Sequence, residues 1–141
     1  MATIGKRGKE PEPTITGQQV EEFERIAGQL SALHQEFGVQ AKSKPDNPIN
    51  KFKLKMLNEK LGAANGLLTG PYKPFADCVL FDDADLPTNS DVALVLSTYL
   101  ASLERWRSAH VYRESGNWYW RTGEGSRIEA ARATIFTPVE R

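Results

Sequence analysis

Three stretches of the chain repeat apolar residues at the three- and four-residue spacing of an amphipathic helix. The first follows Thr16 and Gln19, which stand at capping-box spacing, and we expect it to end at Gly38. The second covers roughly residues 49–68 and ends before a Thr-Gly-Pro sequence. The third covers about residues 90–109 and carries the broadest apolar arc of the three. This third helix is therefore expected to be the central one.

After the third helix the pattern changes from helical to alternating. Residues 110–114 and 118–122 flank the sequence Ser-Gly-Asn, which predicts a β-hairpin. Residues 127–136 are a candidate third strand, and the short apolar run at residues 75–81 is a candidate buried strand. The chain thus predicts an α+β fold, with a three-helix core and a small C-terminal antiparallel β-hairpin or three-stranded sheet.

One domain is expected. Residues 1–15 are polar, contain two prolines and show no apolar period, so we interpret them as a flexible N-terminal tail. Residues 16–141 form the predicted globular domain, whose length suffices for one hydrophobic core.

Composition narrows the class of protein. Of the 141 residues, 40% are hydrophobic and 26% are charged, which is typical of a globular chain. No apolar run approaches the roughly 20 residues of a membrane-spanning helix, so no membrane partner is expected. The basic residues near the N-terminus precede no apolar run, and the single cysteine, Cys78, cannot form an internal disulfide. We therefore expect a cytoplasmic protein.

Charge is distributed unevenly although the formal net charge is zero. Residues 38–75 contain seven basic and two acidic side chains, a net charge of +5. Residues 76–104 contain six acidic and no basic side chains, a net charge of −6. The two blocks either face and neutralise each other in the fold, which we favour, or form separate patches for different partners.

Catalytic and metal-binding patterns are missing from the sequence. The two histidines, His34 and His110, belong to different predicted elements, and no nucleotide-binding, nucleophile-elbow or zinc-ligand motif occurs. The acidic residues Asp82, Asp83 and Asp85 offer a possible metal-dependent enzyme site, but carboxylates at a helix start are common because they favour the helix dipole. We expect a non-catalytic protein that needs no cofactor.

A lysine-rich segment carries the hypothesis of nucleic-acid binding. The segment comprises Lys42, Lys44, Lys51, Lys53, Lys55 and Lys60. On the second helix, Lys53 and Lys60 share one flank of the apolar stripe, while Lys51 and Lys55 share the other. Such a helix can lie along a phosphate backbone, but lysines beside a core more often serve solubility.

The predicted hairpin carries the leading hypothesis. With a three-residue loop, Glu114 pairs with Trp118 and Tyr112 with Trp120, which places Tyr112 and both tryptophans inward. A two-residue loop at Gly116-Asn117 instead puts Arg113 beside the tryptophans.

Either register gathers aromatic rings and arginines, the residue types that dominate protein interfaces. The candidate partner-binding residues are Arg113, Trp118, Tyr119, Trp120 and Arg121. We expect a binding, adaptor or regulatory role with a protein partner. The alternatives are a nucleic-acid partner and a fully buried set of rings that only closes the core. A homodimer is also open, because the first helix has coiled-coil-like spacing over about two and a half heptads.

Overall fold

The computed structural model describes residues 14–77, 80–123 and 128–130. It has the predicted α+β fold, with three helices and a two-stranded antiparallel sheet. The elements are α1 (Gly17–Ser43), α2 (Lys51–Leu67), η1 (Gly70–Tyr72), η2 (Asp83–Asp85), α3 (Asn89–Ala109), β1 (Val111–Glu114) and β2 (Asn117–Trp120). Of the described helices, none is both long and apolar enough to cross a membrane.

Helix α1 begins at the predicted capping box. The Gln19 backbone N–H donates to the Thr16 hydroxyl at 3.1 Å, and the Thr16 N–H donates to the Gln19 side chain at 3.0 Å. The predicted end at Gly38 is wrong, because α1 continues to Ser43. A glycine inside a helix costs only about 1 kcal/mol relative to alanine. The buried Phe37 next to it fixes the last turns on the core.

Helix α3 also begins at a reciprocal cap, in which the side chains of Thr88 and Asp91 each accept the other residue's backbone N–H. Its inner face buries Val92, Leu96 and Tyr99, as the apolar arc predicts. The outer face carries Leu94 with 68% of its surface exposed, so α3 is covered on one side only.

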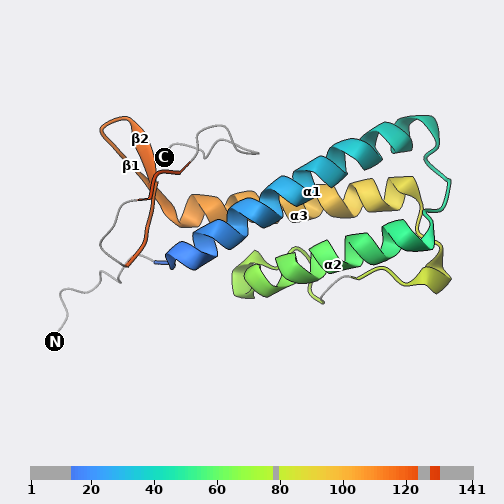
Figure 1. Ribbon diagram of the computed structural model, residues 1–141, viewed down its shortest axis with the longest axis horizontal. Coiled ribbons are helices and arrows are strands. Elements are labelled where there is room, and N and C mark those ends of the chain that lie inside the picture. The colour runs from blue at the N-terminus through green and yellow to red at the C-terminus, as the bar shows by residue number, and fades with distance from the viewer. Residues whose placement is uncertain (1–13, 78–79, 124–127, 131–141) are drawn as a thin grey trace.

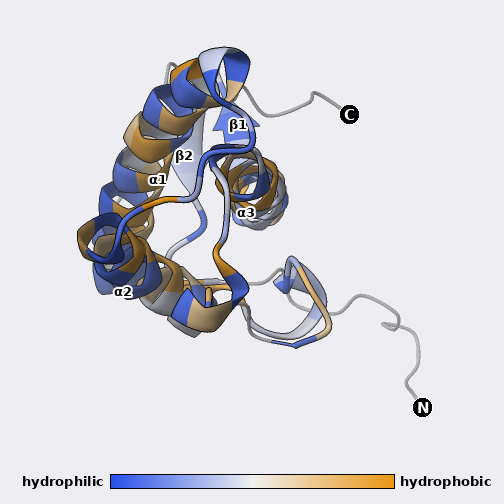
Figure 2. Cartoon of the chain, turned by 90° about the vertical axis from the view of Figure 1, so that its right-hand side faces the viewer, coloured by the Kyte–Doolittle hydropathy of each residue, from blue (hydrophilic) through white to orange (hydrophobic). Residues whose placement is uncertain are grey.

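The three helices surround one core. Helix α1 packs along α3 and also contacts α2, and in Figure 1 α3 is seen between α1 and α2. Looking along α3, α1 and α2 lie on one side of the core and α3 on the other (Figure 2). Leu30, Leu57, Leu61 and Leu96, contributed by all three helices, are fully buried between them.

The segment that links α2 to α3 is held by side chains and not by a sheet. Residues 75–77, 80 and 81 form no strand, so the strand predicted at residues 75–81 is wrong where the structure describes it. The Asn58 amide replaces strand pairing, since it donates to the Phe81 carbonyl and accepts the Phe81 N–H, both at 2.8 Å.

The hairpin lies at the end of the bundle where α1 begins and α3 ends (Figure 1). Two short pairings extend it: Ile15 lies parallel to Thr122, and Glu129 lies antiparallel to Tyr119. Ile15 is buried, so the chain already packs on the domain one residue before the cap of α1. The rest of the predicted tail, residues 1–13, and most of the predicted third strand lie outside the described residues.

Candidate functional site

The turn of the hairpin fixes which side chains share a face. Ser115 has φ of 54° and Gly116 has φ of 84°, so both central residues are left-handed, as in a type I′ two-residue turn. The resulting register pairs Val111 with Trp120, Tyr112 with Tyr119 and Arg113 with Trp118. Of the two alternatives, the three-residue loop is therefore wrong. The two-residue alternative put the turn at Gly116-Asn117, one residue later than the observed turn at Ser115-Gly116. It nevertheless placed Arg113 correctly on the face of the tryptophans.

The base of the hairpin belongs to the core. Trp120 is 2% exposed, and its ring meets Phe23 edge-on at 5.2 Å and Trp106 at 6.0 Å. Phe23 and Trp106 stack at 5.3 Å, which links α1, α3 and β2 through three rings. Val111, opposite Trp120, is also buried. Trp120 thus anchors the hairpin and is not accessible to a partner.

Toward the turn, the same face of the hairpin becomes accessible. Arg113 is exposed and Trp118 is half-buried. The Arg113 guanidinium carbon lies 5.9 Å from the centre of the Trp118 ring, within the range of a cation–π interaction. This contact holds two long side chains together near the tip.

The opposite face carries a second cluster of the same chemistry. The half-buried rings of Tyr112 and Tyr119 lie 5.7 Å apart. The guanidinium carbon of Arg121 lies 5.5 Å from the centre of the Tyr112 ring. Tyr112, which a three-residue loop would place inward, is thus part of this accessible cluster. The two-residue loop is the alternative that places Tyr112 correctly on this face.

His110 joins α3 to the hairpin. Its Nδ1 lies 2.6 Å from the Trp106 carbonyl oxygen, which can only accept, so Nδ1 carries the proton. The ring lies 4.5 Å from the Trp106 ring and 5.8 Å from that of Tyr72. Burial lowers the pKa of His110; the hydrogen bond to Trp106 opposes this and the charge of Arg121 adds to it. This neutral, buried imidazole stabilises the junction between α3 and the hairpin.

An ion pair near the end of α3 is also structural. The Arg107 side chain is 1% exposed and its Nη1 lies 3.8 Å from Glu104 Oε1. Burial raises the pKa of Glu104 and lowers that of Arg107, while their mutual attraction opposes both shifts. Both residues lie on α3, so the pair is local to this helix, and removing one member would leave the other charge uncompensated.

The lysine segment does not form one uniform cationic surface. Lys42, Lys44, Lys51 and Lys55 are exposed, whereas Lys53 and Lys60 are half-buried. The Lys53 ammonium lies 5.9 Å from the centre of the Phe37 ring on α1. Lys51 lies 3.8 Å from Asp83, which brings the basic and acidic blocks into contact there.

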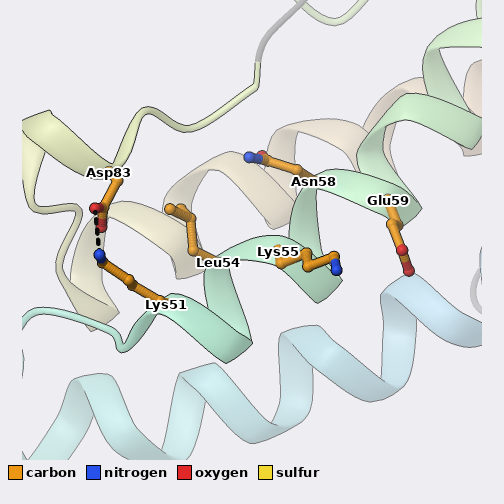
Figure 3. A pocket seen from close by; sticks show the side chains of 6 residues that line it. All are labelled: Lys51, Leu54, Lys55, Asn58, Glu59 and Asp83. Atoms are coloured by element: carbon orange, nitrogen blue, oxygen red, sulfur yellow. Dashed lines mark ion pairs between the residues drawn. The ribbon is translucent and has the colours of Figure 1, made fainter.

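A shallow groove of about 520 Å³ lies between α2 and η2. It is lined by Lys51, Leu54, Lys55, Asn58, Glu59 and Asp83. Figure 3 shows Asp83 turned toward Lys51 at one end, Leu54 between, and Glu59 at the other end. Sequence patterns gave no sign of this groove, because its two walls are far apart along the chain.

The acidic loop has local structural roles. The Asp82 carboxylate accepts the Ala84 backbone N–H at 3.0 Å, and Asp83 pairs with Lys51. Within the described ranges, no three His, Cys, Asp or Glu side chains are grouped so that they could hold a metal ion. The metal-dependent enzyme hypothesis therefore has no ligand set in this part of the chain. Cys78 lies outside the described residues.

Comparison of the chain with models of protein families, with curated proteins and with solved structures found no match.

Proposed function

We propose that the protein is a non-catalytic binding protein whose C-terminal hairpin contacts a protein partner. The arginine side chains that lie over aromatic rings on both faces of the hairpin carry this proposal. Arginine, tryptophan and tyrosine are the residue types that contribute most binding energy at protein interfaces. Because these side chains already contact one another, they lose less conformational entropy when they bind a partner.

The rigid base of the hairpin supports the same role. Trp120 is fixed between Phe23 and Trp106, so the exposed tip is held at a defined position relative to the helices. A guanidinium presents its N–H groups as a planar fork that matches a carboxylate. We therefore expect the partner to carry acidic side chains beside an apolar contact surface.

Site-specific crosslinking tests the location of the interface. A photoreactive amino acid at the exposed Asn117 of β2 should crosslink to a protein partner in cells of the source organism. The matched control carries the same amino acid at the exposed Gln35 of α1, far from the hairpin. Equal adduct yields at both positions would contradict binding at the hairpin.

Substitution then tests the chemistry. Arg113→Ala and Trp118→Ala should each reduce recovery of the crosslinked partner at least tenfold, while the melting temperature stays close to that of the parent. Arg25→Ala serves as the control, because Arg25 is exposed on α1 and pairs only loosely with Glu22 at 3.8 Å. Recovery that survives both hairpin substitutions would refute the role.

Nucleic acid is the alternative partner, and the salt dependence of its binding can be measured separately. Binding through the lysine segment should weaken steeply with salt, because each phosphate contact releases counterions. Fluorescence anisotropy with labelled single- and double-stranded oligonucleotides at 50 and 200 mM salt measures this dependence. Tight, salt-sensitive binding that is lost in Lys51→Ala/Lys55→Ala but kept in Arg113→Ala would replace the protein-binding proposal.

A further inference from the structure

Leu86 combines an unfavourable backbone conformation with an apolar side chain that is exposed to solvent. Its side chain is 65% exposed, and its φ of 49° places it in the left-handed region. Side chains with a Cβ are disfavoured there, and the following Pro87 restricts the Leu86 backbone further. Glycine or asparagine would fit this position better. Strain of this kind persists where surrounding structure enforces it, and it is often associated with function.

The neighbouring backbone holds Leu86 in this position. Its N–H donates to the Asp83 carbonyl at 3.1 Å, which closes the turn of η2. On the other side, the Pro87 carbonyl accepts the Ile49 N–H at 2.9 Å. The apolar side chain is therefore presented to solvent by a fixed loop.

The groove between α2 and η2 lies next to this protruding leucine. Asp83 lines the groove, as Figure 3 shows, and its carbonyl accepts the Leu86 N–H, so the two features are one turn apart along the chain. Leu54 and the aliphatic parts of Lys51 and Lys55 give the groove an apolar interior. A protruding apolar side chain and an apolar groove therefore adjoin on the same part of the surface.

The loop that carries Leu86 and the groove also differ in their charged side chains. The loop that presents Leu86 carries the exposed carboxylates Asp82, Asp83 and Asp85. On α2 the groove is lined by the exposed ammonium groups of Lys51 and Lys55 and, at its far end, by the carboxylate of Glu59. Lys51 is 87% exposed in spite of its contact with Asp83, so an additional carboxylate can approach it.

We infer that a second copy of this chain binds here as a two-fold symmetric dimer, with Leu86 of each copy in the groove of the other. A two-fold axis brings a surface against itself, so adjoining complementary features are satisfied twice. The acidic loop of one copy then faces the α2 lysines of the other. This surface is at the opposite end of the bundle from the hairpin and leaves the proposed partner site accessible (Figure 1).

Analytical ultracentrifugation of the full chain over a range of concentrations tests the dimer. The parent protein should change from the 15.7 kDa of one chain toward twice that mass as concentration rises. Leu86→Gly should remain at 15.7 kDa at every concentration. Because glycine relieves the left-handed backbone, this variant should melt no lower than the parent monomer, which separates loss of the interface from loss of the fold.

Leu94→Ala is the matched control, since Leu94 is equally exposed but lies on the outer face of α3. It should dimerise like the parent. A monomeric parent, or a Leu86→Gly variant that still dimerises, would overturn the inference.

Charge exchange tests the orientation of the two copies. Lys55→Glu and Asp85→Lys should each weaken dimerisation by at least tenfold, and the double variant should recover it. Failure of the double variant to recover would exclude the paired arrangement. A parent that stays monomeric but loses a different protein partner in Leu86→Gly would show that this surface binds that protein and not a second copy.

Discussion

Replacing Trp120 by alanine tests how the hairpin is attached to the helices. The indole is 2% exposed and contacts both Phe23 and Trp106. Truncating a buried tryptophan to alanine costs about 3–5 kcal/mol, since the apolar contacts are lost and a cavity remains. That is a large part of the roughly 5–15 kcal/mol by which a domain is stable. For a chain of this size the melting temperature should fall by roughly 10–20 °C.

Trp118→Ala is the matched control, because it makes the same chemical change two residues earlier on the same face of β2. Trp118 is half-buried and lies beside the exposed Arg113, so we expect a loss of roughly 1 kcal/mol. Urea unfolding followed by circular dichroism measures both free energies. Equal losses for the two variants would refute the observed difference in burial, since a uniform effect requires both rings to be equally buried.

Three further predictions concern local features. Thr88→Ala removes the hydroxyl that caps α3 and should lower the free energy of unfolding by about 1 kcal/mol in urea titrations, whereas an unchanged value would mean that the cap contributes nothing. Ser115→Asn should raise the melting temperature, because asparagine before Gly116 suits a type I′ turn better than serine; a lower melting temperature would contradict the turn type. His110 has a folded-state pKa below its ordinary 6.5, so the unfolded state binds the proton more readily, and stability should decrease as the pH falls below 6.5 toward the folded pKa. His110→Gln should remove that part of the pH dependence, as measured by unfolding between pH 5 and 8, and an identical profile in both proteins would exclude His110 as its source.

Sequence patterns predicted the helices well where the local signals and the core agree. The capping residue Thr16 begins α1 as expected, because a cap depends only on residues within one turn, and α3 begins after Thr88, close to its predicted start at about residue 90. The apolar stripes also marked the buried faces, since helical spacing places those residues on one side.

The predictions failed where distant contacts outweighed a local preference. Helix α1 passes through Gly38, and the loop that follows it is tied to the start of α3: the Lys44 carbonyl accepts from the Asn89 side chain at 2.9 Å. The apolar run near Phe81 is fixed by Asn58, 23 residues earlier in the chain, so its own β propensity does not decide its conformation.

By itself, the sequence determined three amphipathic helices, a hairpin and a concentration of arginine and aromatic residues in that hairpin. Only the tertiary structure decided which of those rings are accessible, because a shift of one residue in register moves every side chain to the other face. In the observed register Val111, and not Tyr112, is buried opposite Trp120, which leaves Tyr112 on the accessible face. The folded chain alone also brought Leu86 and the groove of α2 together, because their proximity depends on how the helices pack.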